Sequence, residues 1–435
     1  MTEDRLQDHP QRYALTNELH ARPFPELTAP CRAVVLAVKQ PLNAANRDPE
    51  ADRAHLRDLL DRHGATHPPP GGNHFSGRLG RHWLKWERHT EFVTYTIYAE
   101  GVADAPFTGS VFSTFPRDWL DRAPGKVLTS VLVRVEPVDD VAAITKEDLN
   151  RVQGWFVPES LAMSQVVDQQ AVVASDFRID PAGHVRFAAL VERGIGQRRL
   201  GRIVQRLVEI ETYKSISMLT LPVARQVSGR VAELDGEMSA LVAGMAAGQG
   251  GESQTLDRLL AMSAEIEALS SSSAFRFGAV EAYGAIVQQR IEVLREERIQ
   301  GRQTFEEFML RRFDPAMRTC RSAKNRLDEL SQRATRAATL LRTRVEVNIA
   351  AQNRTLLESM DRRAALQLRL QETVEGLSVV AISYYAVSLA GYVITPVADR
   401  VGVDKTVLQA LLAFPVIAAV WWMVRSIRRR VARRS

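Results

Sequence analysis

The chain has 435 residues, too many for one compact core, so its length predicts two or three structural units. The formal net charge is +6, but residues 425–435 alone carry six arginines and no acidic residue. Because those six charges account for the whole excess, the composition excludes a broad basic surface for nucleic acid. Cys31 and Cys320 lack the paired spacing of a zinc cluster, and no disulfide is expected.

The first distinctive stretch is NELHARPFPEL at residues 17–27. Glu18, His20 and Arg22 alternate within five residues, and two prolines stiffen the chain directly after them. Titratable side chains this close together indicate either a functional site or a charged loop with a rigid exit.

Residues 1–190 are predicted to form an α+β cytoplasmic domain. Runs of apolar and β-branched residues predict strands at 31–39, within 82–99 (one long strand or a hairpin), at 125–137, and as a pair within 171–190. Residues 49–64 have a helical pattern with Pro49 in the first turn and Gly64 past the end. Strands and helices without regular alternation are typical of an α+β fold.

Residues 191–375 are predicted to form a helical stalk region. One helix should run from about residue 197 until Pro222 bends or breaks it, a second should end near Ser270–Ser273, and a third should span about 275–299. From Pro315 a helical pattern continues for about 75 residues, or roughly 100 Å. Its apolar residues lie close to a heptad repeat that predicts coiled-coil-like packing, at Leu327, Leu330, Ala334, Ala337, Leu341 and Val345.

Residues 376–424 are predicted to form a transmembrane hairpin. Segments 376–398 and 407–424 carry no charged side chain and are long enough to cross a bilayer, whereas a buried hairpin of a soluble domain is the alternative. Arginines precede the first segment, and Trp421, Trp422 and the basic tail at 425–435 end the second. The positive-inside rule therefore predicts a multi-pass protein with both termini in the cytoplasm.

One face of the first predicted span is polar. Hydroxyl-bearing and small residues recur there at helical spacing, at Tyr384, Tyr385, Ser388, Gly391, Tyr392 and Thr395. Hydroxyl groups in hydrocarbon need partners, so this face should meet water, other copies of the chain or its own partner helix. The first two options predict a homo-oligomer gathered around an axis.

A candidate metal site comes from WERHTEF. If the segment is a strand, Glu87, His89 and Glu91 project from one face, where they could bind a divalent metal ion or move protons. The alternative is a solvated strand face with cross-strand ion pairs. Pairing with the first stretch would add His20 to the cluster.

A weaker candidate is an anion site before the helix at residue 197. Gly194 and Gly196 precede a helix start, where backbone N–H groups favour anions. The dinucleotide fingerprint needs a further glycine where Arg199 stands. The chain shows no phosphate-binding loop, nucleophile elbow or zinc-protease motif.

At NELHARPFPEL, WERHTEF, SDFRID and RRLGRIVQRLVEIETYK the chain resembles the bacterial family of uncharacterised membrane-anchored proteins catalogued as domain of unknown function 3422. The resemblance spans nearly the whole chain and implies an anchor in the inner (cytoplasmic) membrane. It implies no activity.

The layout is also similar to that of CorA-type magnesium channels, which carry a Gly-Met-Asn motif at the outer end of the first span. Here the corresponding sequence is AGYVITP. We therefore expect a non-enzymatic, oligomeric inner-membrane protein with a cytoplasmic binding or scaffold domain, in contact with the lipid bilayer. The alternative is a CorA-like divalent cation channel whose first span lines the pore.

Overall fold

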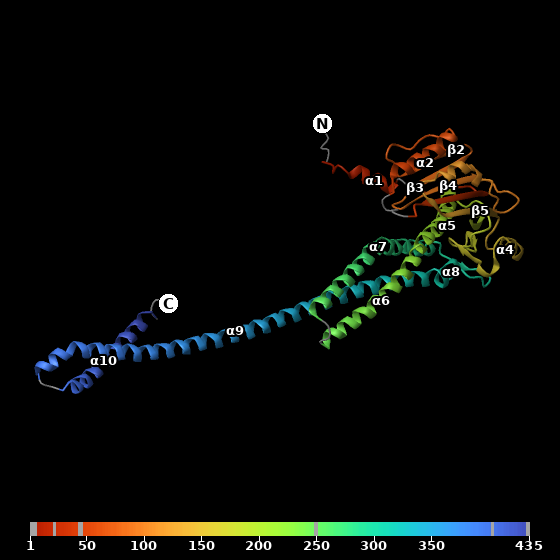
Figure 1. Cartoon of the computed structure of the whole chain (residues 1–435). Helices are drawn as coiled ribbons and strands as arrows, with labels where there is room; N and C mark the ends of the chain where they lie inside the picture. The colour runs from red at the N-terminus through yellow and green to blue at the C-terminus, as the bar shows by residue number, and fades with distance from the viewer. Residues whose placement is uncertain (1–6, 21–22, 42–46, 248–250, 402–403, 432–435) are drawn as a thin grey trace. The chain divides into compact units, whose positions relative to one another are not determined.

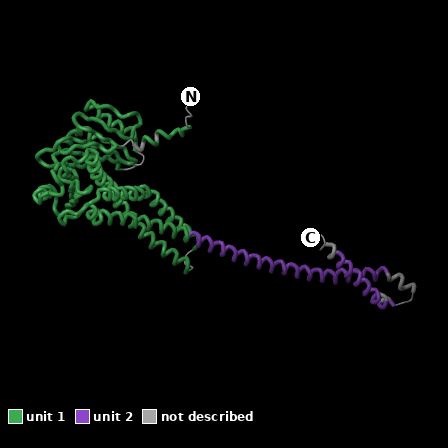
Figure 2. Tube along the Cα trace, turned by 180° about the vertical axis from the view of Figure 1, so that it is seen from behind, with its two compact units in different colours: residues 1–337 green, residues 338–435 purple. Residues whose placement is uncertain are grey.

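The computed structural model describes residues 7–20, 23–41, 47–247, 251–401 and 404–431. The chain divides into two compact units, residues 1–337 and 338–435 (Figure 2). The first unit extends past the predicted boundary at residue 190, because the helices that follow the strands pack on the sheet and on one another.

A nine-stranded mixed sheet forms the centre of the first unit (Figure 1). Its spatial order is β2-β3-β4-β1-β5-β8-β7-β6-β9, and every neighbouring pair is antiparallel except β5 and β8. The strands are β1 (Cys31–Lys39), β2 (His74–Leu79), β3 (His82–Arg88), β4 (Phe92–Glu100), β5 (Lys126–Val138), β6 (Ala162–Val166), β7 (Ala171–Ser175), β8 (Val185–Glu192) and β9 (Glu297–Arg298). The predicted α+β fold is confirmed, and residues 82–99 form a hairpin.

Short helices accompany the sheet. They are α1 (Arg12–His20), η2 (Phe112–Thr114), α3 (Arg117–Asp121), α4 (Lys146–Gln153), η3 (Pro158–Ser160) and the longer α2 (Pro49–Arg62). α2 begins as its sequence predicts, because the Asp48 carboxylate accepts a hydrogen bond from the Glu50 amide and Pro49 occupies the first turn. Glu18 and His20 belong to α1, so the conditional strand pairing of this stretch with residues 86–92 does not form at these two positions.

The two faces of the sheet carry different side chains because successive residues of a strand point to opposite sides. On β4, Val93, Tyr95 and Ile97 enter an apolar core with residues of α2 and α3, including Leu56 and Trp119. The residues of β3 and β4 that alternate with these face helix α5 (Gln197–Met218), which follows β8 in the chain. The sheet therefore has one apolar face and, opposite it, a face that is partly polar.

The remaining helices follow the sheet in the chain, and all but α8 are long. They are α5 (Gln197–Met218), α6 (Thr220–Ala246), α7 (Glu252–Glu292), α8 (Phe305–Arg312), α9 (Asp314–Val401) and α10 (Lys405–Val431). The predicted break at Ser270–Ser273 is wrong, because α7 continues through it and the Ser273 hydroxyl donates to the Leu269 carbonyl at 2.6 Å. The continuous helix predicted from Pro315 onward is confirmed by α9.

The start of α9 packs beside α6 and α7 within the same chain. Arg333 pairs with Asp235 of α6, and Lys324 pairs with Glu281 of α7 at 2.9 Å. Heptad residues of α9 within the first unit are buried in the contact: Leu327, Leu330, Ala334 and Ala337. These positions of the predicted seam are therefore filled by neighbouring helices of one chain.

A buried carboxylate ties the sheet to α7. The Glu91 side chain is fully buried, contacts Lys39 of β1 at 3.2 Å and forms an ion pair with Arg276 of α7. Burial lowers the pKa of Lys39, and the charge of Glu91 opposes that shift. Tyr283 lies close enough for Glu91 to contribute, after burial, to raising the tyrosine pKa to about 12.

Replacing this carboxylate should destabilise the first unit. Glu91→Gln leaves Lys39 and Arg276 buried without a counter-charge, and breaking such a pair costs about 3–5 kcal/mol. Glu281→Gln, which removes the more exposed pair with Lys324, is the control and should cost about 0–1 kcal/mol. Urea unfolding of the full chain in detergent, followed by tryptophan fluorescence, measures both. Equal midpoints for the two variants would contradict the structural role of Glu91.

Candidate functional site

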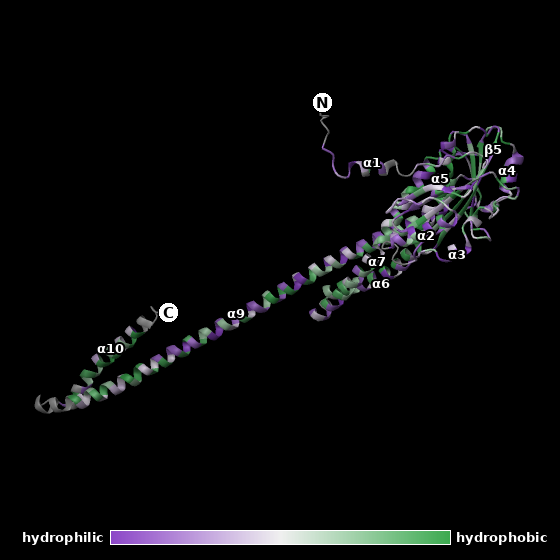
Figure 3. Cartoon of the chain, turned by 90° about the horizontal axis from the view of Figure 1, so that it is seen from above, coloured by the Kyte–Doolittle hydropathy of each residue, from purple (hydrophilic) through white to green (hydrophobic). Residues whose placement is uncertain are grey.

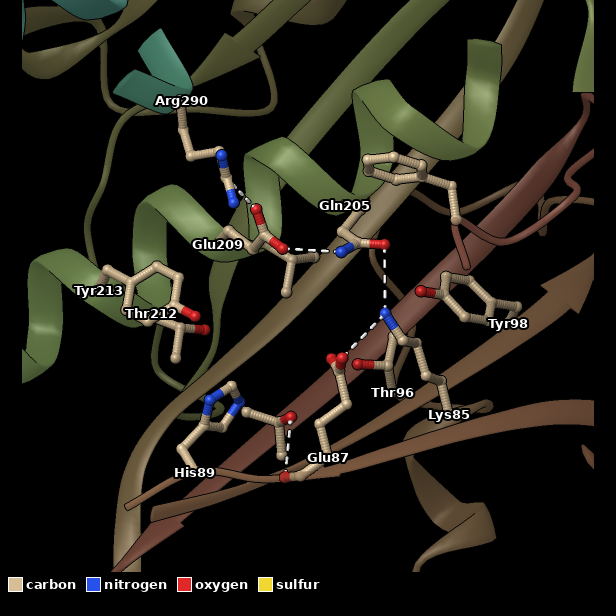
Figure 4. A pocket seen from close by; sticks show the side chains of 13 residues that line it. Lys85, Glu87, His89, Thr96, Tyr98, Gln205, Glu209, Thr212, Tyr213 and Arg290 are labelled. Atoms are coloured by element: carbon tan, nitrogen blue, oxygen red, sulfur yellow. Dashed lines mark hydrogen bonds and ion pairs between the residues drawn. The ribbon is translucent and has the colours of Figure 1, made fainter. Parts of the chain in front are cut away.

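A pocket of about 290 Å³ lies between the polar face of β3 and β4 and helix α5 (Figure 4). We call it the α5 pocket. It is lined by Phe24, Lys85, Glu87, His89, Thr94, Thr96, Tyr98, Gln205, Val208, Glu209, Thr212, Tyr213 and Arg290. The lining thus combines the N-terminal segment, two strands, the turn between them and helices α5 and α7.

Strand geometry supplies the floor of the α5 pocket. Lys85 and Glu87 are two residues apart on β3, so they point to the same side, and their salt bridge measures 3.2 Å. In the β3–β4 register Lys85 lies opposite Thr96, and Glu87 lies opposite Thr94. Together these four residues place a polar patch on the side of the sheet that faces α5.

Helical spacing supplies the opposite wall. Gln205, Glu209, Thr212 and Tyr213 are separated by four, three and one residues, which places them on one face of α5. Arg290 reaches the same place from α7 and forms an ion pair with Glu209.

A continuous chain of polar contacts crosses the α5 pocket (Figure 4). Lys85 donates to the Gln205 side-chain oxygen at 3.2 Å, and Gln205 Nε2 donates to Glu209 at 2.7 Å. With the Lys85–Glu87 and Arg290–Glu209 pairs, this chain joins two cations and two carboxylates. The formal charges of these four side chains cancel.

Hydroxyl groups complete the polar lining. The Thr212 hydroxyl is buried and has no hydrogen-bond partner among the residues that the structure describes. Burial, followed by the charge of Glu87, raises the pKa of Tyr98, and burial, followed by Glu209, raises the pKa of Tyr213. Both phenols therefore stay protonated at neutral pH and can donate a hydrogen bond.

The N-terminal segment reaches the α5 pocket because it crosses α5 at a glycine. A Cβ placed on Gly201 would lie 1.7 Å from the carbonyl oxygen of Pro25, so only glycine permits this approach. The Leu27 amide donates to the Gln197 carbonyl at 3.2 Å, and Arg198 pairs with Glu26 at 2.9 Å. The crossing sets Phe24 at the pocket, where it is 44% exposed.

Comparison with protein families identifies one match. The model of the family described as "Protein of unknown function (DUF3422)" matches residues 7–431. The chain belongs to this family. No curated protein matches the chain.

The structure separates the carboxylates of the predicted metal site of this DUF3422 chain. Glu87 lies on β3, which ends at Arg88, whereas His89 and Glu91 belong to the turn before β4, so the single strand face predicted for them is wrong. Glu87 and His89 line the α5 pocket, whereas Glu91 is held by Lys39 and Arg276. The His89 ring stacks on Phe92, with ring centroids 4.2 Å apart.

No metal-binding group is found among the described residues, where no three His, Cys, Asp or Glu side chains converge. The side chain of His20 lies outside the described residues. Cys31 and Cys320 are free and buried, and burial raises the pKa of each thiol, of Cys31 to about 12.

The two predicted anion-site glycines precede α5 as expected. Gly194 has a φ of +93°, and Gly196 occupies the cap position of the helix. The adjacent basic side chains are already partnered, since Arg198 pairs with Glu26 and Arg199 donates to Gln170. The anion-site hypothesis stays a prediction.

The polar face of the predicted first span divides in two within the second unit. Gly391 lies against α10, because a Cβ added to it would lie 2.6 Å from the Gln409 side-chain nitrogen. Tyr384, Tyr385 and Tyr392 are instead exposed in the single chain, at 70%, 72% and 80%. The Ser388 hydroxyl donates to the Tyr384 carbonyl at 2.8 Å, and the side chain of Thr395 lies outside the described residues.

Most residues that line the α5 pocket belong to no motif recognised in the sequence. Positions 205, 209, 212 and 213 lie beside the apolar stripe of α5, where an ordinary solvated helix face would also carry such residues, so their pattern gave no signal. The contributions of Phe24 and Arg290 depend on contacts between distant segments. No local pattern marks them.

Gly201→Ala should displace the N-terminal segment from α5. The added methyl group overlaps the Pro25 carbonyl, and overpacking of this kind costs about 1–3 kcal/mol. Gly229→Ala is the matched control, because Gly229 lies in α6 with no atom within 4 Å of an added Cβ. We expect faster proteolysis before residue 31 and a lower melting temperature only in Gly201→Ala. Identical proteolysis of the two variants would show that the crossing is not fixed.

Proposed function

We propose that this protein is a membrane-anchored, self-associating, non-enzymatic binding protein whose N-terminal unit lies in the cytoplasm. The anchor rests on one observation. The end of α9 and most of α10 are apolar, and both helices are long and apolar enough to cross a membrane by length and composition (Figure 3). Only 11% and 6% of the two most apolar windows are buried within the chain.

Exposed apolar side chains support this proposal energetically. Leu389, Phe414 and Trp422 are 70%, 81% and 69% exposed, and each would gain about 1.5–3 kcal/mol on leaving water. In a bilayer, Trp421 and Trp422 would lie near the interface, with Arg425 4.7 Å above the Trp421 ring centroid. A hairpin of α9 and α10 then keeps both basic flanks on the cytoplasmic side.

Reporter fusions test this topology. A reporter placed before Met1 and one placed after Ser435 should both report the cytoplasm, because arginines flank both apolar segments on that side. A fusion inserted between residues 401 and 405, the chain segment that joins α9 to α10, is the matched control and should report the opposite side. A non-cytoplasmic signal at either terminus, or recovery of the chain in the soluble fraction, would contradict the anchor.

Self-association is supported by two surfaces of α9 that lack cover within the chain. Phenol groups in hydrocarbon need hydrogen-bond partners, and the tyrosines at 384, 385 and 392 are exposed in the single chain. Closer to the first unit, exposed Ile349, Leu356, Leu370 and Leu377 follow one another at multiples of seven residues. A second copy anchored in the same membrane would place its α9 parallel to this one, with the same heptad positions in register.

Cysteine cross-linking tests the parallel contact. In a chain whose Cys31 and Cys320 are replaced by alanine, Leu356→Cys should form a disulfide between copies on mild oxidation in membranes. Arg354→Cys lies two residues away on the outer side of the same heptad and is the control. We expect a band of twice the monomer mass mainly for Leu356→Cys. Equal cross-linking at both positions, or none at either, would contradict the seam.

The channel alternative is weaker on physical grounds. Cation filters use backbone carbonyls or rings of carboxylates. α9 is a continuous helix through this segment, so its carbonyls are engaged in helical hydrogen bonds except that of Tyr392, because Pro396 has no N–H to donate to it. Residues 376–398 carry no carboxylate. The exposed tyrosines are therefore better suited to contacts between copies than to dehydrating a divalent cation.

The binding role is supported by the α5 pocket. Its described lining offers threonine and tyrosine hydroxyls but neither serine nor cysteine, and its carboxylates are paired with cations. Such a lining can recognise a polar ligand through hydrogen bonds and ion pairs. We therefore assign the pocket to binding.

A further inference from the structure

We propose that the α5 pocket binds a small zwitterion of amino-acid size, with its anionic group toward Lys85 and Arg290 and its cationic group toward Glu87 and Glu209. This inference rests on the binding role proposed above and names the chemical class of the ligand. It is carried by two ion pairs that line the same pocket, Lys85–Glu87 on the strand wall and Arg290–Glu209 on the helix wall (Figure 4).

Volume limits the size of the ligand. The α5 pocket has about 290 Å³, at the lower end of the range of roughly 300–1,000 Å³ found for small-molecule sites. A nucleotide or a peptide would not be enclosed. A molecule with a few polar groups and a short side chain would fit.

Charge balance selects a zwitterion over a simple ion. The Lys85 side chain is only 7% exposed, and those of Glu87 and Glu209 are 17% and 19% exposed. A singly charged ligand would leave one pocket charge without a partner in a partly desolvated space, which is costly. A zwitterion inserts between the cations and the carboxylates and leaves the total charge at zero.

An unpartnered buried hydroxyl gives independent support. Thr212 is one of the residues that line the α5 pocket, and its buried Oγ1 has no hydrogen-bond partner among the described residues. Leaving a buried polar group unpaired costs about 1–3 kcal/mol. A bound carboxylate or ammonium group would satisfy it.

The remaining lining suits a short apolar side chain. Phe24, Val208 and the ring of Tyr213 contribute apolar surface to the same pocket. Because Phe24 lies in the segment that crosses α5 at Gly201, the ligand would contact the NELHARPFPEL stretch directly. This contact gives that stretch a role as one wall of the binding site.

Calorimetric titration of the full chain in lipid nanodiscs tests the ligand class. The probes are the free neutral L-amino acids, each compared with its N-acetyl form, which keeps only the negative charge, and its amide, which keeps only the positive charge. We expect at least one free amino acid to bind and both blocked forms to bind about tenfold more weakly or worse. Binding of no free amino acid, or equal binding of a blocked form, would overturn the proposal.

Variants locate the binding. Thr212→Val keeps the shape and removes the hydroxyl, and Glu209→Gln removes one negative charge without changing size; each should weaken binding severalfold. Glu281→Gln, on the surface of α7, is the control and should bind as the unmodified chain does. Unchanged affinity in both pocket variants would overturn the assignment to this pocket. Membrane fractionation of the same samples separates the two proposals. Loss of membrane association would contradict the proposed membrane anchor. Absence of binding by protein that is still membrane-associated would contradict only the proposed ligand class.

Discussion

Strands β3 and β4 have to serve two environments at once, because a two-residue period sends neighbouring side chains to opposite faces of the sheet. Tyr95 and Ile97 complete the apolar core under α2 and α3, while Thr94, Thr96 and Tyr98 between them face α5. A shift of one residue in the β3–β4 register would exchange these sets and bury the polar one in the core. The position of the α5 pocket therefore depends on the same register that builds the core.

The electrostatics of the first unit follow from local pairing. Glu91 is buried with Lys39 and Arg276, Asp52 is buried with Arg47, and the α5 pocket pairs Lys85 and Arg290 with two carboxylates. Buried pairs are compensated only if nearly every charge has a partner. That requirement agrees with a sequence that is neutral outside its basic tail. The α5 pocket differs from these two clusters in having open volume beside its ion pairs.

Local signals predicted local structure well. Pro49 placed the start of α2 correctly, and the apolar and β-branched residues of 82–99 indicated strand structure, which forms a hairpin. The serine run at 270–273 wrongly predicted a helix end, because serine is unfavourable in isolated helices. Here Ser273 is buried in α7 and its hydroxyl donates to the helix backbone. Of the residues that line the candidate site, the sequence indicated Glu87 and His89.

The other residues that line the candidate site could not be predicted from one sequence. Arg290 lies 81 residues from its partner Glu209, and no spacing rule links them. Gly201 looked like an ordinary glycine within a helical pattern, although its lack of a side chain lets Pro25 approach α5. The predicted metal cluster failed to converge for a similar reason. The distant cations Lys39 and Arg276 hold Glu91, and the turn geometry keeps it apart from Glu87.

The continuity of α9 places a physical demand on the rest of the chain. Residues 342–375 contain no glycine or proline, and pairs such as Arg342–Glu346 and Arg354–Glu358 add about 0.3–0.5 kcal/mol each. Those contributions are small compared with the side-chain packing that normally stabilises a helix. In this part of α9 nearly all apolar residues are exposed in the single chain. Its leucine and isoleucine side chains are therefore not buried by packing within one chain. A parallel copy anchored in the same membrane would supply that contact along the helix and hydrogen-bonding partners for the tyrosines at its end. One proposed interaction thus accounts for both surfaces.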